Sequence, residues 1–369
     1  MKRKILYVAS TQSHLERFHK PYLAELAKKY EVKTMATGKD IDFPVLFDKH
    51  FFSFANLRSI GKIRKILKRE QFDAIILHTT LAAFLCRMAM WGMGRKKRPY
   101  VLNVVHGYLF SKGERGLRAR ILLLCERLLR GKTDAIAVMN KEDLEIAKEH
   151  RLCRGEITFI NGMGVIGADE QPGPNLDLKR QFAPEGELLC GFVGELSGRK
   201  NQRFLINAVR RLREEGLPMR LLLLGEGGER EALEHCIDEA DLRDFVFCPG
   251  NVEPIIPYLA AMDLYVSASR SEGLPFNIME AMSVGLPIVA SATKGQTDLL
   301  EEYDNSLYPL DDTDAFCAAV RRAYETGSLG AGAVCYPSLE RYRLASVFDD
   351  NMKILDPFSD PENKGSSDV

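Results

Sequence analysis

The chain has 369 residues, too many for one ordinary domain and enough for two. Hydrophobic residues make up 46% and charged residues 28%, which is typical of a globular protein and excludes a disordered or fibrous one. Lysine plus arginine and aspartate plus glutamate number 51 each, a balance that argues against a general nucleic-acid-binding protein. Eight scattered cysteines without a C-x-x-C pair indicate free thiols in a reducing compartment.

The first half of the chain alternates short apolar runs with longer segments of helical period, which is typical of parallel α/β architecture. Its basic start leads through a short apolar run into polar residues, and therefore predicts a strand rather than a signal peptide. No apolar run approaches the ~20 residues of a transmembrane helix, and we expect a cytoplasmic protein. The expected strands are 5–9, 32–36, 74–78, 100–105, 135–139 and 157–160, and the expected helices lie near 16–29, 57–69, 80–91, 116–130 and 141–149.

The pattern restarts after a polar, Pro/Gly-rich segment, 169–187, which we expect to be a linker. A final amphipathic segment, 338–355, predicts a helix that crosses back toward the first domain, and residues 356–369 have the composition of a disordered tail. The first helix of the second half is expected to bury a stripe of apolar residues and to end at Gly216. That stripe consists of Phe204, Leu205, Ala208, Val209 and Leu212, and the expected strands are 188–193, 220–224, 245–247, 264–267 and 288–290.

Two βαβ series in one chain predict an α/β protein with two doubly wound, Rossmann-like domains, 1–168 and 188–337, that face each other across a cleft. Ligands bind such sheets at the carboxyl ends of the strands, so the cleft is the expected site.

Two motifs are rejected because of their context. The string 162–167 matches the G-x-G-x-x-G dinucleotide fingerprint, but a Pro/Gly-rich sequence follows where a helix should begin. We interpret these glycines as a flexible hinge rather than a phosphate loop. The Asp-x-Asp strings 40–42 and 312–314 lie in turn-like stretches, where solvated or capping carboxylates are commoner than metal ligands, and we predict no metal site.

The most informative segment is 269–287, SRSEGLPFNIMEAMSVGLP, which follows an expected strand. Gly273 permits a sharp turn and Pro275 suits the first turn of a helix, so the amides of this turn would form an anion site. Glu272 precedes the turn and Glu280 lies about two helical turns later. Because carboxylates accept paired hydrogen bonds from vicinal hydroxyls, two of them beside a diphosphate suit a sugar and a ribose. Periodicity alone fits equally well a helix with two surface glutamates.

The segment from Glu272 to Glu280 resembles the Glu-x7-Glu signature of glycosyltransferase family 4, a family of retaining enzymes with the two-Rossmann GT-B fold. Further landmarks stand in the order of the family, and the resemblance covers nearly the whole chain. They are a loop similar to the phosphate-binding loop at 193–201, a strand–glycine turn at 224–227, a base-framing segment at 249–252 and a glycine turn at 294–296.

The resemblance implies a role for each residue that would bind the nucleotide-sugar donor. Glu272 would bind hydroxyls of the sugar, Glu280 would bind the ribose, and Lys200 would neutralise the diphosphate. A fixed cation and amide dipoles stabilise the departing diphosphate most in the transition state, where its charge grows. The full expected set is Gly194, Lys200, Gly225, Asn251, Val252, Glu272, Gly273, Leu274, Pro275, Phe276 and Glu280, with His106, Glu272 and Lys200 as catalytic residues.

The chain departs from the family pattern at Glu195, where many members carry an arginine that contacts the diphosphate. An acid cannot perform that task. Either Arg199 or Arg203 would compensate, or Lys200 would act alone.

In the first half, His106 directly follows an expected strand and precedes a glycine. The resemblance places this histidine against the reacting sugar, and a purely structural histidine is the alternative.

The first loop, 10–14, lacks the paired glycines common in the family. Instead, this region and the stretch 106–113 look similar to the branch that builds capsular and extracellular polysaccharides in bacteria. The residues expected on the acceptor side are Ser13, His14, His19 and Tyr108.

Two basic segments suggest contact with a membrane surface. Residues 115–132 hold six basic residues around a Leu/Ile-rich stripe, and residues 95–98 form a second cluster. A basic amphipathic helix can lie on anionic lipid, and the family's lipid-linked acceptors favour this interpretation. An ordinary core helix with a solvated rim fits the same pattern.

Together these features predict a retaining, metal-independent hexosyltransferase without a cofactor. It would move a sugar from a UDP-sugar to a saccharide acceptor on a polyprenyl diphosphate, in cell-surface polysaccharide synthesis at the inner face of the plasma membrane. The resemblance implies front-face displacement without a protein nucleophile. The alternatives are a nucleotide-sugar 2-epimerase of the same fold and a non-catalytic nucleotide-sugar-binding protein.

Overall fold

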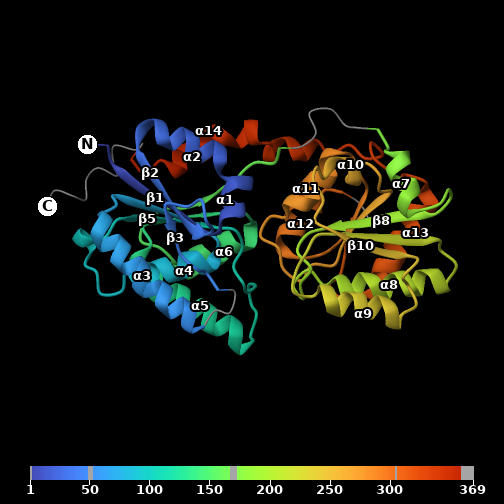
Figure 1. Ribbon diagram of the computed structural model, residues 1–369, viewed down its shortest axis with the longest axis horizontal. Coiled ribbons are helices and arrows are strands. Elements are labelled where there is room, and N and C mark those ends of the chain that lie inside the picture. The colour runs from blue at the N-terminus through green and yellow to red at the C-terminus, as the bar shows by residue number, and fades with distance from the viewer. Residues whose placement is uncertain (1, 49–52, 167–172, 304–305, 359–369) are drawn as a thin grey trace. The chain divides into compact units, whose positions relative to one another are not determined.

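The computed structural model describes residues 2–48, 53–166, 173–303 and 306–358 (Figure 1). The chain divides into two compact units, each built on its own parallel sheet. Unit 1 consists of Met1–Gly164 and Leu344–Val369, and unit 2 of Val165–Arg343. The chain therefore leaves unit 1, forms unit 2 and returns to unit 1.

Unit 1 has a seven-stranded sheet with the order β3-β2-β1-β4-β5-β6-β7. Because β1 has β2 on one side and β4 on the other, the direction of winding reverses at the neighbouring strands β1 and β4, and such sheets bind ligands at this point. The strands are β1 Lys4–Thr11, β2 Glu31–Thr37, β3 Phe43–Pro44, β4 Ala74–His78, β5 Tyr100–Val105, β6 Ala135–Val138 and β7 Ile157–Phe159. The helices are α1 Gln12–Phe18, α2 Lys20–Lys29, α3 Phe54–Glu70, α4 Thr80–Ala89, α5 Leu117–Leu129, α6 Lys141–Glu149 and α14 Leu344–Leu355.

Helices cover both faces of this sheet (Figure 1). On one face, α3 and α4 bury apolar residues of β1 and β4. On the other, α14 packs on α2, where the rings of Tyr22 and Phe348 stack with their centroids 5.1 Å apart. The side-chain amide of Asn351 donates to the Tyr22 hydroxyl at 2.9 Å. The returning helix is therefore an integral layer of unit 1, and the middle strands are apolar along most of their length because they are covered twice.

Unit 2 has a six-stranded parallel sheet with the order β10-β9-β8-β11-β12-β13. Its winding reverses between β8 and β11, by the same rule as in unit 1. The strands are β8 Leu188–Val193, β9 Met219–Leu224, β10 Val246–Gly250, β11 Leu264–Ser267, β12 Ile288–Ser291 and β13 Leu307–Tyr308. The helices are α7 Leu176–Phe182, α8 Gln202–Glu214, α9 Arg230–Glu239, α10 Ile256–Leu259, α11 Phe276–Ser283, α12 Lys294–Leu300 and α13 Thr313–Thr326.

The core of unit 2 lies between this sheet and the helices α8, α9 and α13. Helix α8 buries Leu205, Ala208, Val209 and Leu212, four of the five residues of the expected stripe, and Phe204 packs against the same core from a partly buried position. The helix stops just before Gly216, which has a φ of +87° that favours glycine. The periodicity of the sequence therefore located this core-facing helix.

The prediction of two doubly wound α/β domains is confirmed. Some local features differ from the expected ones. The segment 169–187 contains α7, which has no buried residues and therefore leaves no apolar periodicity in the sequence. Likewise, the helix expected at 16–29 is two helices, because the backbone breaks at His19 between α1 and α2.

The C-terminal segment also differs from the expectation. Instead of one helix at 338–355, the chain forms a 3-10 helix, Pro337–Tyr342, in unit 2 and then α14 in unit 1. Asp356, the first residue of the expected tail, is buried and accepts from the Tyr30 hydroxyl at 2.6 Å. The rest of that tail, 359–369, lies outside the described residues. No helix in the described part of the chain is long and apolar enough to cross a bilayer.

Candidate active site

In unit 2, one carboxylate lies between two cations at the carboxyl ends of β8 and β11. Lys200 Nζ is 2.5 Å from Glu272 Oε1, and both side chains are buried. Arg199 Nη1 lies 3.1 Å from Glu272 Oε2 and also donates to the Ser271 carbonyl oxygen at 2.8 Å. The fold thus brings together two residues of the predicted donor-binding set, Lys200 and Glu272. It adds Arg199, which the sequence suggested only as a replacement for the arginine missing at position 195.

The electrostatics of this cluster follow from burial and from opposite charge. Burial alone would raise the pKa of the Glu272 carboxyl, but Lys200 and Arg199 outweigh it and hold that pKa below its ordinary value. Burial lowers the pKa of Lys200, and the neighbouring Glu272 opposes this only in part. Breaking a buried pair of this kind by removing one partner is costly, because the other charge stays buried.

Glycines shape the backbone beside this cluster. Gly194 and Gly225 have φ angles of +152° and +141°, and Gly225 N donates to the Gly250 carbonyl oxygen at 2.9 Å. A Cβ at Gly225 would overlap the carbonyl oxygen of Gly194, so the two strand ends approach as closely as glycine alone allows. A Cβ at Gly295 would likewise overlap the carbonyl oxygen of Gly273. The glycine turns that the sequence singled out are therefore required at two places, where the ends of β8 and β9 approach each other and where α12 begins beside the turn at Gly273.

The predicted helix after Pro275 is present as α11, with Pro275 at its N-cap position. It places Gly273, Leu274 and Phe276 in and around its first turn, while Glu280 lies further along the helix and is half-buried. The helix therefore presents its positive end next to the Lys200–Glu272 cluster. Asn251 and Val252, expected to frame the base, follow β10 and are exposed and half-buried, respectively.

Two residues of this region that sequence reasoning missed hold the loop in place. The side-chain amide of Asn277 donates to the Val193 carbonyl oxygen at 2.7 Å, which ties α11 to the end of β8. The hydroxyl of Tyr265, in β11, lies 3.2 Å from Val193 N and so joins the same strand end. A polar residue inside the Glu-x7-Glu segment was a usable signal for Asn277, whereas an isolated tyrosine within a strand was not.

In unit 1, four histidines gather at the carboxyl ends of the adjacent strands β1, β4 and β5. They are His14 in α1, His19 between α1 and α2, His78 at the end of β4 and His106 just after β5. His78 Nδ1 lies 3.0 Å from His106 Nε2, and His19 Nδ1 lies 2.9 Å from the Tyr7 hydroxyl. Sequence reasoning selected His14, His19 and His106 separately, but it did not bring them together and it missed His78.

These histidines are kept neutral by burial. Desolvation lowers the pKa of His14 to about 4. It also lowers the pKa of His19 and His78 well below the ordinary range, with the neighbouring histidines adding to the effect, and it does the same to His106 with the help of His14. An imidazole that stays neutral at physiological pH can accept a proton or bind a metal ion through its lone pair.

The other two residues expected on the acceptor side lie elsewhere. Ser13 is exposed, with its hydroxyl 3.2 Å from that of Thr11. The side chain of Tyr108 is buried in the core beneath α5, where its ring stacks with that of Phe110. The expectation that Tyr108 faces an acceptor therefore needs correction, because an aromatic ring that follows a strand can be drawn into the apolar layer below it.

The motifs rejected in the sequence have structural roles. Gly164 has a φ of +84°, and a Cβ there would overlap Leu344, so Gly164 allows close packing where the chain leaves and re-enters unit 1. The hinge itself stays a prediction. Gly167, at the end of that motif, lies outside the described residues. Asp42 accepts from the Thr34 amide at 2.9 Å, and Asp312 caps α13 by accepting from the Ala315 amide at 2.9 Å.

The basic segments differ from each other in exposure. Helix α5 buries Glu126, its single acid, in a two-bond pair with Arg87 at 2.7 and 2.8 Å. Arg98, counted in the cluster 95–98, is not available on the surface, because it forms a two-bond pair with Asp134 at 2.5 and 2.7 Å and its side chain is 2% exposed. The exposed part of that cluster is Arg95–Lys97.

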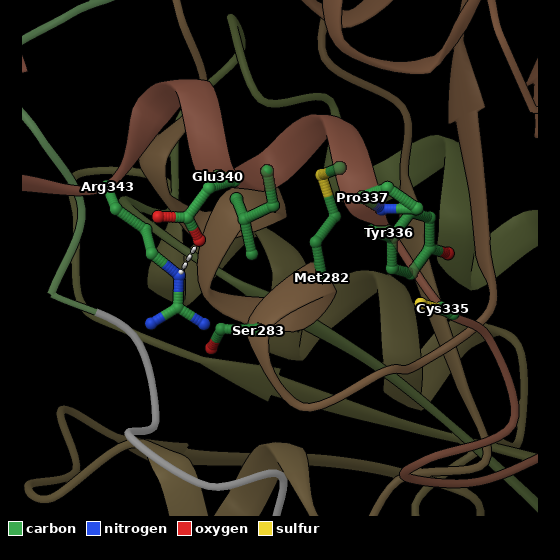
Figure 2. Close-up of a pocket in the computed structure, with 8 residues that line it drawn as sticks. Met282, Ser283, Cys335, Tyr336, Pro337, Glu340 and Arg343 are labelled. Carbon is green, nitrogen blue, oxygen red and sulfur yellow. Dashed lines mark ion pairs between the residues drawn. The ribbon is translucent and has the colours of Figure 1, made fainter. Parts of the chain in front are cut away.

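A pocket of about 190 Å³ lies at the carboxyl end of α11 (Figure 2). Figure 2 shows the Arg343–Glu340 ion pair, with a nitrogen–oxygen distance of 2.9 Å, on one side and Tyr336 and Cys335 on the other. Met282 lies between them. None of the predicted donor-binding residues lines this pocket, which lies at the opposite end of α11 from the Lys200–Glu272 cluster.

Solved structures identify the class of this fold. The structure of HepE from Anabaena in complex with UDP and glucose matches with a TM-score of 0.73 at 17% identity, covering 96% of this chain and 99% of that one. Two parallel-sheet, Rossmann-like domains in one chain are the GT-B architecture, and the protein is a glycosyltransferase of the GT-B fold.

Sequence comparison identifies the family. Residues 41–161 match the glycosyl transferase 4-like domain, and residues 187–326 match glycosyl transferases group 1. EpsD of Bacillus subtilis (strain 168), which is named as a glycosyltransferase, is 26% identical over 341 residues, 89% of each chain. An Escherichia coli protein named UDP-Gal:alpha-D-GlcNAc-diphosphoundecaprenol alpha-1,3-galactosyltransferase is 27% identical over 278 residues, 72% of this chain and 70% of that one. The chain belongs to glycosyltransferase family 4, which confirms the resemblance seen in the sequence.

Proposed function

We propose that this glycosyltransferase moves a hexosyl group from a UDP-sugar to a saccharide acceptor carried on a polyprenyl diphosphate, with retention of configuration, in the synthesis of a cell-surface polysaccharide. The name of one relative supports the donor and the acceptor. EpsD and the Escherichia coli galactosyltransferase match most of the chain, and the name of the latter contains UDP-Gal and a diphosphoundecaprenol-linked acceptor.

The observation that carries the proposal is the position of Glu272 between Lys200 and Arg199, next to the N-terminal end of α11. Two cations and a helix N-terminus form a site for an anion of high charge, such as a diphosphate. In the absence of the donor, the cations neutralise Glu272. When the donor binds, we propose that they turn toward the diphosphate and that sugar hydroxyls take their place on the Glu272 carboxylate.

This arrangement also supplies a replacement for the arginine that the family carries at the position of Glu195. Arg199 reaches the same carboxylate as Lys200, whereas Glu195 is exposed. Arg203 is exposed on α8, and we assign the second cationic role to Arg199. With two cations in place, we propose that the diphosphate needs no divalent metal ion and the enzyme no cofactor.

For the chemical step, we propose front-face displacement, in which the departing phosphate helps to deprotonate the acceptor hydroxyl. The bond between the anomeric carbon and the phosphate oxygen breaks, the acceptor oxygen bonds to that carbon on the same face, and its proton passes to the phosphate. Lys200 and Arg199 stabilise the charge that develops on the leaving group. His106 is the residue of unit 1 that we assign to the reacting sugar, and its neutral ring can hydrogen-bond a hydroxyl.

We further propose that α5 contacts an anionic membrane surface from the cytoplasmic side. Four apolar side chains on this helix, at positions 117, 121, 124 and 128, are 74, 41, 53 and 57% exposed. Their spacing places them on one stripe of the helix, between the exposed residues Arg118, Arg120 and Arg127. Because Glu126 is buried on Arg87, the exposed face carries apolar and basic side chains together, which suits an anionic lipid surface.

The proposal is tested with a thermal-shift panel of UDP, GDP, ADP and their common sugars, in magnesium or in chelator. We expect UDP and one UDP-sugar to stabilise the protein equally in both buffers, because a ligand that binds only the native state raises its stability. Glu280→Gln should remove the shift caused by UDP, whereas Glu272→Gln should remove only the extra shift caused by the sugar. Glu231→Gln, an exposed glutamate on α9, is the matched control.

The outcomes also separate the alternatives. A protein that is stabilised by no nucleotide is not a transferase of this kind. Conversion of the UDP-sugar to its epimer without an acceptor would indicate a 2-epimerase. Stabilisation by a UDP-sugar without turnover, in the presence of lipid-linked saccharide acceptors, would indicate a binding protein.

A further inference from the structure

The histidine cluster of unit 1 has the composition of a metal site, although the sequence predicted none. His14, His19 and His106 each offer one ring nitrogen, and these three atoms lie within 4.8 Å of one another. Nitrogen atoms bound to one tetrahedral zinc ion are roughly 3.4 Å apart. Small side-chain rotations would therefore bring the three rings to coordinating distance.

The hydrogen bonds of the cluster leave the right atoms available. His19 bonds the Tyr7 hydroxyl through Nδ1 at 2.9 Å, and His106 bonds His78 through Nε2 at 3.0 Å. Histidines that bind a metal ion through one nitrogen usually hold a partner with the other, which fixes the ring and its tautomer. Tyr7 and His78 would serve as these positioning partners, leaving His19 Nε2 and His106 Nδ1 for an ion.

Two of the available atoms are buried polar groups that need a partner. The Nε2 atoms of His14 and His19 are shielded from solvent, and neither has a hydrogen-bond partner among the described residues. Buried polar atoms are almost always satisfied, and an exception points to an ion or a water molecule. A water molecule could meet both atoms, so the experiment has to distinguish water from a metal ion.

The protonation state also suits a metal ion. Burial lowers the pKa of all four histidines, so their lone pairs are not lost to protons at neutral pH. His14 and His106 are half-buried, which leaves a route from solvent. Imidazole is a preferred ligand of zinc, copper, nickel and iron, but not of magnesium or calcium.

We propose that His14, His19 and His106 bind one borderline-soft transition-metal ion, for which Zn²⁺ is the probe, with the fourth position open to water or a substrate group. All three histidines belong to unit 1, and the inference does not rest on the proposed transferase function. If His106 also acts on the sugar, an ion held there would inhibit transfer, which would be a consequence of both proposals.

The test is a titration of Zn²⁺ into the chelator-treated full chain, in competition with a chromophoric chelator and without nucleotide. We expect one equivalent to bind with a Kd below about 1 µM. His14→Gln and His19→Gln should each weaken binding at least tenfold, and Tyr7→Phe, which keeps the ring, should weaken it by about 10- to 100-fold. The double variant His150→Gln/His235→Gln removes two histidines outside the cluster and is the matched control.

Co²⁺ in place of Zn²⁺ distinguishes histidine from the eight free cysteines, because thiolate ligands add an intense ultraviolet charge-transfer band that imidazole ligands lack. If the wild-type chain binds no Zn²⁺ at 10 µM, or binds it equally after His14→Gln and Tyr7→Phe, the proposal is wrong and a water molecule satisfies the cluster. Tyr7→Phe and His14→Gln keep the test valid if the fully buried His19 does not tolerate substitution. Since no sugar nucleotide is present, failure here leaves the proposed transferase function untouched.

Discussion

The two units place buried titratable groups at the same position of the same architecture, yet with opposite electrostatics. At the carboxyl edge of the sheet in unit 2, Glu272 lies against Lys200 and Arg199. At the corresponding edge in unit 1, four histidines lie against one another and Tyr7. One cluster is held by opposite charges, and the other is neutral.

The difference teaches what burial does in each case. Burial disfavours the charged form of any group, and the outcome depends on whether a counter-charge is available. Beside Glu272 two cations prevail over burial, so the carboxylate keeps its charge and a pKa below the ordinary value. Around the histidines the neighbours act in the same direction as burial, so the rings stay neutral. Unit 2 is therefore equipped for an anion, and unit 1 for groups that use a lone pair.

Acid should affect the neutral cluster first, and this is the largest effect that we expect. Folding lowers the pKa of each of the four histidines. Below pH ~6.5 the histidines of the unfolded chain therefore bind protons, while those of the folded chain stay unprotonated. Stability is thus present above pH ~6.5 and is lost as the pH falls toward the folded pKa, by up to ~1.4 kcal/mol per histidine and pH unit. We therefore expect unit 1 to be less stable at pH 5.5 than at pH 7.5.

Urea unfolding of the chelator-treated protein at pH 7.5, 6.5 and 5.5 measures this loss. The single tryptophan, Trp91, lies in unit 1, and its fluorescence reports on that unit. His78→Gln should reduce the slope of the free energy of unfolding against pH by the contribution of one histidine, up to ~1.4 kcal/mol per pH unit. The Glu272 pair loses its contribution only below pH ~4.3, since the pKa of that carboxyl is lowered on folding. A stability of unit 1 that is flat between pH 7.5 and 5.5 would contradict this account.

The charged cluster should be the more sensitive one in transfer assays. Lys200→Met keeps the length of the side chain and removes its charge, and should lower kcat/KM on the order of 10²- to 10³-fold, as the loss of one stabilising group on a leaving anion does. Arg199→Met should cost less, because the Arg199 side chain is 41% exposed and Lys200 remains. Initial rates of UDP release from the donor selected by the thermal-shift panel measure both effects.

Lys179→Met is the matched control for this pair of variants. Lys179 lies 2.8 Å from Asp263 in the same unit and forms no part of the proposed donor site. It should keep the wild-type rate, and circular dichroism should show all three variants to be folded. A wild-type rate in Lys200→Met would remove Lys200 from the mechanism.

The sequence predicted the architecture well because strands that are buried on both faces, such as β1 and β4, appear as continuous apolar runs, and a helix with one buried face, such as α8, shows a clear helical period. It also selected Lys200, Glu272 and His106, because motifs fix their order along the chain. It missed His78 and the pairing of Arg199 with Glu272, because neither follows from local spacing. A contact between residues 199 and 272 depends on which strands are neighbours in the sheet. The strand-end rule applied to β4 would have found His78.

The core position of Tyr108 shows a second limit. Its place after β5 was indistinguishable in the sequence from that of His106, yet one side chain joins the histidine cluster and the other packs beneath α5. Such a choice is made by the volume available under the helix, which no local pattern encodes. The sequence analysis also missed the short helix α7 and the two-residue strands β3 and β13, because these elements are too short to show an apolar period.

The smallest expected effect concerns the exposed face of α5. Unlike the neutral histidine cluster of the same unit, this face carries basic side chains. Leu124→Gln/Leu128→Gln removes two half-exposed apolar side chains, each of which contributes on the order of 1 kcal/mol when it enters the interface. We expect the double variant to bind vesicles rich in anionic lipid about tenfold more weakly in low salt, in a sedimentation assay. Leu57→Gln changes a leucine on α3 that is 69% exposed, and this variant should bind like the wild type. Equal recovery of the wild type by neutral and anionic vesicles would instead show that the basic face of α5 does not recognise lipid, since electrostatic attraction predicts a difference that salt removes.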